Sequence, residues 1–178
     1  MRLRLAAVPA LAACAVAAHG APSETRYNGP RLSFSVPVGV QVREVADPAA
    51  DYAVELVPPK GTLAQTSLRI IASQARVGDA DVEIIAGAWR DARLRNRASW
   101  GVRRQGETRT ELAQIGSRRF VRFSDQMSSV LGAARQLMLC GSVSGRLVCG
   151  VASGPSEKEQ EAEAVLVRVL ETVLVHKK

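Results

Sequence analysis

The chain has 178 residues, a length suited to one domain, and its 47% of hydrophobic residues fits a globular protein. Aromatic residues make up only 4%, so valine, leucine, isoleucine and alanine must supply most of the buried area. The formal net charge is +7 with just two histidines, which excludes most catalytic and zinc-binding chemistry that needs a positioned imidazole.

The first twenty residues predict a secretory signal peptide. Arg2 and Arg4 form a cationic start, and the apolar run over residues 5–18 is too short to span a bilayer, which takes about 20 residues. Small residues precede Ala21, so we expect cleavage there. The mature protein would then be periplasmic or secreted.

Residues 11–14 (Leu-Ala-Ala-Cys) offer an alternative, because they resemble a bacterial lipobox in which the cysteine is lipidated and becomes the mature N-terminus. Against it, only six residues separate Arg4 from this motif, and the apolar run continues past Cys14 as in an ordinary signal. Both alternatives stay open at this point, and both place the domain outside the cytoplasm.

A flexible leader is expected over residues 21–30, followed by one domain over residues 31–178. Alternating apolar residues predict four strands in the first part of this domain. These strands cover residues 32–36, 38–42, 52–56 and 67–77.

A helical period replaces the alternation after Gly78. We expect a long helix that is capped by Asp79 and ends near Trp100, with Gly87 allowing close packing on a sheet. Residues 102–125 then predict two or three strands with turns near Gly106 and residues 115–117.

A glycine-containing loop over residues 127–133 leads to a β-hairpin, and the chain closes with a second helix. Ser156 and Glu159 predict a capping box at the start of this helix. Apolar residues at helical spacing continue to Val173, and two lysines at the end complement the helix dipole.

Cys140 and Cys149 lie on the two arms of the predicted hairpin, whose two-residue turn is Ser144-Gly145. Counting outward from that turn, the two cysteines face each other in a non-hydrogen-bonded pair, where cross-strand side chains approach most closely. We therefore expect a disulfide, which an oxidising compartment would maintain. Two buried free thiols are the alternative.

The order of strands, long helix, antiparallel strands and terminal helix predicts an α+β domain in which two helices flank one antiparallel β-sheet, an α/β/α sandwich. This order, together with the opening segment Leu-Ser-Phe-Ser-Val-Pro-Val-Gly at residues 32–39, resembles the PsbP-like family. That family includes the extrinsic photosystem protein, a Ran-binding homologue, DcrB-like envelope lipoproteins and chaperones of type VI secretion effectors. The resemblance implies a binding or assembly role without a shared active site.

Ten arginines against three acidic residues give the segment 90–122 a charge of +7. Such a cluster can attract an anionic partner, or it can be an ordinary solvated face. We expect seven of these arginines to form a patch for an anion or a protein partner: Arg90, Arg93, Arg97, Arg103, Arg104, Arg118 and Arg122. As surface residues, the three on the helix should tolerate replacement without loss of the fold.

No catalytic, cofactor-binding or metal site is predicted. His19 leaves with the signal, and His176 lies on an expected frayed end. Asp79, Asp81 and Glu83 lack the glycine and distal glutamate of a calcium loop and fit the first turn of a helix. Nucleic-acid binding is not expected either, because strand periodicity leaves no row of stacking aromatic residues among the arginines.

Two functions agree with these features. The sequence favours an exported, non-enzymatic binding module that acts through protein–protein contact in the cell envelope, in an assembly, chaperone or immunity-type role. The alternative is a binder of anionic ligands that uses the arginine cluster on lipid headgroups, lipopolysaccharide or another polyanion. A hydrolase with paired carboxylates comes third, because no spacing points to such a pair.

Overall fold

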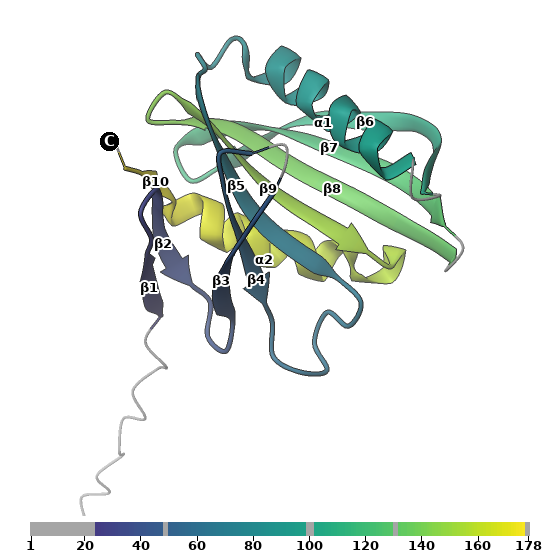
Figure 1. The fold of residues 1–178 in the computed structure, drawn as a ribbon, viewed down its shortest axis with the longest axis horizontal. Helices are drawn as coiled ribbons and strands as arrows, with labels where there is room; N and C mark the ends of the chain where they lie inside the picture. Colours follow the sequence, from purple (N-terminus) through teal and green to yellow (C-terminus); the bar gives the residue numbers. More distant parts are fainter. Residues whose placement is uncertain (1–23, 48–49, 99–101, 130–131, 177–178) are drawn as a thin grey trace, which may run out of the picture.

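The computed structural model of the chain describes residues 24–47, 50–98, 102–129 and 132–176. Within these residues an α+β fold is confirmed, with two helices and ten strands in two antiparallel sheets (Figure 1). The two helices flank the seven-stranded sheet as expected, and a small three-stranded sheet, which was not expected, accompanies it. The expected signal peptide, its cleavage site and Cys14 lie outside the described residues.

The first half of the chain forms strands β1 to β5 and helix α1. Their bounds are β1 (Thr25–Asn28), β2 (Leu32–Val36), β3 (Gln41–Val45), β4 (Tyr52–Val57), β5 (Ser67–Arg76) and α1 (Val82–Ala98). The second half forms four long strands, a short 3-10 turn, helix α2 and a last short strand. Their bounds are β6 (Arg103–Ile115), β7 (Arg118–Ser129), β8 (Gly132–Val143), β9 (Arg146–Gly154), η1 (Ser156–Lys158), α2 (Glu159–Thr172) and β10 (Leu174–Val175).

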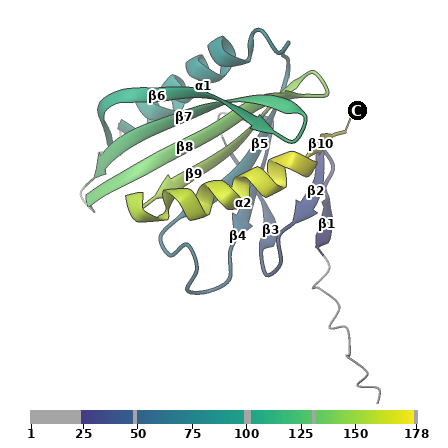
Figure 2. The ribbon, with the colours of Figure 1, turned by 180° about the vertical axis from the view of Figure 1, so that it is seen from behind.

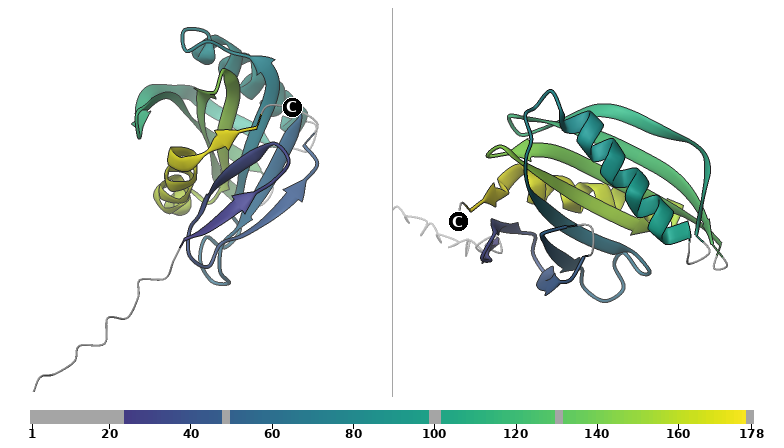
Figure 3. Two further views of the ribbon diagram at one scale, coloured as in Figure 1. Left: turned by 90° about the vertical axis from the view of Figure 1, so that its left-hand side faces the viewer. Right: turned by 45° about the horizontal axis from the view of Figure 1, so that its top comes forward.

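The large sheet has the strand order β3-β4-β5-β9-β8-β7-β6. Strands β6 to β9 are successive hairpins, and β9 then pairs with β5, so the two halves of the chain meet at the centre of the sheet. α1 lies across one face (Figure 1), and α2 lies across the opposite face (Figure 2). Views from other directions show both helices against the same curved sheet (Figure 3).

Each face of the large sheet has its own apolar core. On one face, Val82 and Ala86 of α1 pack on a cluster that includes Ile71, Met138 and the two cysteines. On the other face, the buried residues of α2 pack on the sheet and on β2 of the small sheet. Helical spacing in α2 explains this contact, because Ala162, Leu166, Val169 and Leu170 are all buried on one side of the helix.

The small sheet has the order β1-β2-β10, and two of its strands correct our expectations. Residues 25–28 were expected to be a flexible leader, but they pair with β2 as β1. The terminal helix was expected to run past Val173, but it ends at Thr172, and the two residues of β10 pair with β2. The sheet also holds His176, which was expected to be frayed: its backbone N–H donates to the Arg31 carbonyl at 2.9 Å, and its Nε2 lies 3.1 Å from Ser33 Oγ.

Local turn chemistry moved several element boundaries. The strand expected at residues 38–42 begins only at Gln41, because Val40 N–H closes a turn onto the Pro37 carbonyl. Asp79 does not cap α1, since the Asp81 carbonyl accepts the first helical hydrogen bond, from Ile85. The turn expected near Gly106 is a bulge inside β6, where this glycine has a φ of 70°.

The start of α2 also differs from the capping box that Ser156 and Glu159 predict. Residues 156–158 form the 3-10 turn η1, and α2 begins at Glu159 without a capping hydrogen bond from the side chain of the preceding Lys158. Glu159 instead reaches the sheet, where its carboxylate accepts from Ser124 Oγ at 2.8 Å. The Glu159 side chain therefore makes a tertiary contact in place of the capping hydrogen bond that the local motif predicts.

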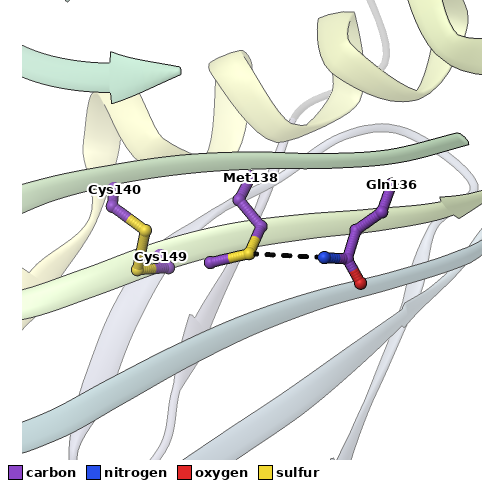
Figure 4. Close-up of a disulfide and its surroundings, with 4 residues drawn as sticks. All are labelled: Gln136, Met138, Cys140 and Cys149. Atoms are coloured by element: carbon purple, nitrogen blue, oxygen red, sulfur yellow. Dashed lines mark hydrogen bonds between the residues drawn. A yellow bond between two sulfur atoms is a disulfide. The ribbon is translucent and has the colours of Figure 1, made fainter. Parts of the chain in front are cut away.

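The disulfide between Cys140 and Cys149 is confirmed. The two residues are register partners on β8 and β9, their Cα atoms are 4.1 Å apart, and both are buried under α1. Gln136 and Met138 precede Cys140 on the same face of β8 (Figure 4), and Gln136 Nε2 donates to Met138 Sδ at 3.7 Å. A loop of about ten residues closed by this bond stabilises the fold by about 3 kcal/mol in the chain-entropy model.

Two glycines allow a matched test of the packing. A Cβ on Gly141 would lie 2.8 Å from two ring carbons of Phe120, its register partner on β7, whereas a Cβ on Gly87 in α1 would meet nothing within 4 Å. Gly87 therefore does not serve close packing, contrary to our expectation.

We predict that Gly141→Ala lowers the free energy of unfolding by about 1–3 kcal/mol through overpacking. Gly87→Ala should raise it by about 1 kcal/mol through helix propensity. Urea unfolding measures both, and equal effects would contradict the packing described here.

Candidate functional site

The seven arginines expected to form one patch are divided between the two faces of the large sheet. The side chain of Arg97 lies outside the described residues, so six can be placed. Arg118 and Arg122 contact α2 on one face, whereas Arg90 and Arg93 belong to α1 on the other. These six residues therefore do not form a continuous surface.

Arg118 and Arg122 hold α2 on the sheet. Arg118 Nη1 donates to the Val173 carbonyl at 2.9 Å, so it satisfies the C-terminal end of the helix. Arg122 donates to Glu163 at 2.8 Å and to Glu159 at 3.1 Å. The hydrogen bond to Glu163 is the main cause that raises the pKa of Arg122 above its usual value. Both arginines therefore serve to hold α2 against the sheet.

Arg93 is the charged residue most deeply buried in this group, with 8% of its surface exposed. Its Nη1 donates to both carboxylate oxygens of Asp47, at 2.9 and 2.7 Å, and Arg69 Nη1 lies 3.3 Å from the same carboxylate. Asp47 is itself buried, so the two guanidiniums compensate a carboxylate that has lost its hydration. The expectation that Arg93 is a replaceable surface residue was therefore wrong.

The remaining arginines line one open groove between the end of α1 and the start of β6. The groove has a volume of about 580 Å³, and its basic residues are Arg90, Arg95, Arg103 and Arg104. Asp91, Leu94 and Val102 complete the lining, so four positive charges face one negative charge. We call this feature the α1–β6 groove. It contains three of the expected arginines and adds Arg95.

The charges in the α1–β6 groove differ in how firmly they are held. Arg90 lies over the Phe123 ring, with 5.0 Å between its guanidinium carbon and the ring centroid, and it also binds Asp91 at 2.6 Å. Arg95 and Arg103 are exposed, and in the described part of the chain their side chains make no ion pair. These two guanidiniums are available to an outside anion.

Arg104 is positioned by a chain of hydrogen bonds that ends at a buried carboxylate. Its Nη1 donates to Thr108 Oγ1 at 2.9 Å, and Thr108 Oγ1 donates to Asp125 Oδ1 at 2.5 Å. Asp125 has no exposed surface, and among the described residues its Oδ2 has no hydrogen-bond partner. The bulge in β6 brings Thr108 over Asp125, so the bulge and the buried acid together fix the orientation of Arg104 at the groove.

Strand β6 forms the outer edge of the large sheet beside the groove. Among the described residues it pairs with β7 alone, so the backbone groups on its other side are open. It carries charges of both signs, in the order Arg103, Arg104, Glu107, Arg109 and Glu111. Leu112 adds an apolar side chain that is 65% exposed. Bulges and charges of this kind limit unspecific edge-to-edge pairing.

The described part of the chain contains neither a metal-binding cluster nor a membrane-spanning helix. No group of three or more histidine, cysteine, aspartate or glutamate residues there could hold a metal ion. None of the helices there is both long enough and apolar enough to cross a bilayer.

Comparison with known proteins identifies the fold. No protein-family profile matches the chain, and no curated protein matches it in sequence. The solution structure of cyanobacterial PsbP (CyanoP) from Synechocystis superposes with a TM-score of 0.57 at 16% identity, over 89% of this chain and 96% of that one. The likeness confirms the expected PsbP-like fold.

Two other solved structures show weaker likeness. A crystal structure from Bacteroides thetaiotaomicron has a TM-score of 0.51 and 11% identity, over 83% of this chain but only 46% of that one, so this chain spans about half its length. LpqN of Mycobacterium tuberculosis, described as involved in cell envelope biogenesis, has a TM-score of 0.44 and 12% identity, over 87% of this chain and 91% of that one. The likeness to CyanoP establishes the PsbP-like fold of this chain, and at 16% identity it establishes nothing about the ligand.

The burial of Arg93 and the exposure of Arg95 lead to a paired prediction. Arg93→Met removes the nearer of the two guanidiniums that pair with the buried Asp47 carboxylate, so it should lower the free energy of unfolding by about 3 kcal/mol. Arg95→Met removes the same charge from an exposed site and should change it by less than about 0.5 kcal/mol. Urea unfolding at neutral pH measures the difference. Equal stability of the two variants would show that the Asp47–Arg93 pair does not stabilise the fold.

Proposed function

We propose that the protein is an exported, non-enzymatic binding module whose α1–β6 groove and open β6 edge together receive an extended acidic segment of a partner protein. One observation carries the proposal: a groove with four arginines lies directly beside an unpaired strand edge. An edge of this kind can accept a further strand through backbone hydrogen bonds, and side chains in adjoining pockets then supply specificity.

The charge pattern supports an acidic protein segment over an anionic membrane. Arg95 and Arg103 can pair with carboxylates, and Leu112 can contact an apolar side chain further along the edge. Glu107, between Arg104 and Arg109, and Glu111, beyond Arg109, would repel a uniformly negative bilayer. A groove also encloses an extended chain better than it meets a flat surface. The lipid or lipopolysaccharide alternative is thus the less favoured one.

The binding proposal can be tested with a synthetic peptide of alternating glutamate and valine. We expect it to bind the wild type, and Arg95→Glu combined with Arg103→Glu should weaken binding by about tenfold or more, since two attractions become repulsions. The matched control, Arg119→Glu with Arg168→Glu, makes the same change of charge at two other exposed arginines and should leave the affinity unchanged. Isothermal titration calorimetry at low salt measures each affinity.

Two further probes separate the modes of binding. A peptide with the same sequence but N-methylated at alternate residues keeps its charges and loses backbone donors, so it should bind more weakly if a strand is added to β6. Vesicles of phosphatidylglycerol should bind poorly. Strong vesicle binding without peptide binding would contradict the proposal and support the anionic-lipid alternative, and equal loss of peptide binding in the test and control variants would contradict the site.

The proposed export has its own test, supported by the cationic start and apolar run of residues 1–18 and by the Cys140–Cys149 disulfide. Protein recovered from the periplasm of a bacterial host should have the mass of residues 21–178 with both cysteines oxidised. Intact mass spectrometry before and after thiol alkylation checks both points. A lipidated N-terminus at Cys14 would establish the lipoprotein alternative, and retention of the full chain in the cytoplasm would contradict export.

A further inference from the structure

We infer that the cleft between the two sheets is a second binding site, separate from the α1–β6 groove, and that it takes a phosphate monoester through Arg31, Arg76 and Arg146. The cleft has a volume of about 520 Å³ and shares no lining residue with the groove. Arg31, Val175 and His176 line it from the small sheet, and the large sheet provides the opposite wall. Ligand pockets of small molecules commonly have volumes of about 300–1,000 Å³.

The two cleft arginines that belong to the large sheet form a like-charged pair with no stabilising role in the described structure. Arg76 on β5 and Arg146 on β9 are register partners, directly opposite each other on neighbouring antiparallel strands. Like charges in this position destabilise a sheet. In the described part of the chain neither guanidinium has an acidic partner. An anion bound between them would remove this repulsion.

The cleft retains a positive charge after its acidic residue is counted. Arg31, Arg76 and Arg146 face a single carboxylate, that of Asp51, which leaves a charge of +2 when His176 is neutral. A phosphate monoester carries between about one and a half and two negative charges at neutral pH and presents three acceptor oxygens. Three guanidiniums from separate segments suit such a group, whereas a carboxylate presents two oxygens in one plane.

His176 and Tyr52 complete the walls in different ways. The ring of His176 is held at Ser33 Oγ through Nε2, and the backbone of His176 is tied to Arg31, so the two basic residues of the small sheet are fixed together. Tyr27 OH donates to Glu44 at 3.1 Å, so Tyr52 OH must donate to Tyr27 OH at 2.5 Å. Burial is the main cause that raises the pKa of both tyrosines, and Tyr52 thus lines the cleft as a neutral ring.

The size of the cleft indicates more than a bare ion. Ala72, Val175 and the ring of Tyr52 provide apolar surface beside the arginines, so an organic group can accompany the phosphate. The same phosphoryl chemistry occurs in soluble metabolites and in lipid headgroups. Glycerol 3-phosphate and vesicles containing phosphatidic acid are therefore the two probes that distinguish these sources.

The test compares the wild type with Arg76→Gln combined with Arg146→Gln. We expect glycerol 3-phosphate or phosphatidic acid vesicles to bind the wild type, glycerol not to bind, and the double variant to bind about tenfold more weakly or worse. The control, Arg119→Gln with Arg168→Gln, changes the charge equally at exposed residues outside the cleft and should bind as the wild type does. Calorimetry serves the soluble probe, and co-sedimentation serves the vesicles.

Thermal unfolding gives a second, independent measurement and shows that the variants fold. Without a ligand the double variant should melt at or above the temperature of the wild type, because the like-charge repulsion is gone. Glycerol 3-phosphate, if it is the form that binds, should raise the melting temperature of the wild type and not that of the double variant. The proposal is overturned if neither probe binds, if the double variant binds as the wild type does, or if citrate binds more tightly than glycerol 3-phosphate.

Discussion

A seven-stranded sheet is wider than any single helix that covers it, and this constraint determines where the protein has open surface. At a spacing of about 4.8 Å, seven strands extend about 29 Å, whereas a helix with its side chains is about 10 Å wide. On one face α1 covers the strands around the disulfide and leaves β6 at its margin. On the other face α2 needs the small sheet beside it to complete the core. The α1–β6 groove and the cleft between the two sheets both lie at the margins of the area that these elements cover.

Carboxylates from distant parts of the sequence explain why a dense run of arginines is not one binding surface. Asp47 forms an ion pair with Arg93, 46 residues away in sequence, and Glu163 forms one with Arg122, 41 residues away. Glu159 also pairs with Arg135 at 2.9 Å. A count of charge along residues 90–122 includes only neighbours in sequence. The acidic residues that neutralise several of these arginines lie far away in the chain. The arginines that remain open are those for which the fold brings no acid near.

The periodic features of the sequence predicted much of the fold. The alternation in β2, β4 and β5 and the helical spacing in α2 set the architecture, and counting outward from the Ser144-Gly145 turn gave the Cys140–Cys149 register. β1 and β10 were missed because strands of four and two residues carry too little pattern, and both exist through pairing with β2. The capping box failed because Glu159 finds partners on the sheet that no local motif reveals.

The candidate site was less predictable, for the same physical reason. Three residues of the α1–β6 groove were predicted by their density of charge, but Arg95 was passed over because helical spacing alone does not show which side of α1 meets β6. A signal for it existed in the strong positive charge at the end of the helix. The bulge at Gly106, which fixes Arg104 through Thr108, could not be separated from a turn on sequence alone.

The cleft shows a different relation between sequence and site. Arg31, Arg76 and Arg146 are isolated in the chain, and no count of local charge singles them out. Pairing of β5 with β9 places two of them opposite each other, and pairing of β2 with β10 brings the third beside His176. Structural arginines in this protein have carboxylates or carbonyls within hydrogen-bond distance, as Arg93 and Arg118 do. Arginines that face one another without such partners lower stability in the free protein, and a bound anion is what would reverse that effect.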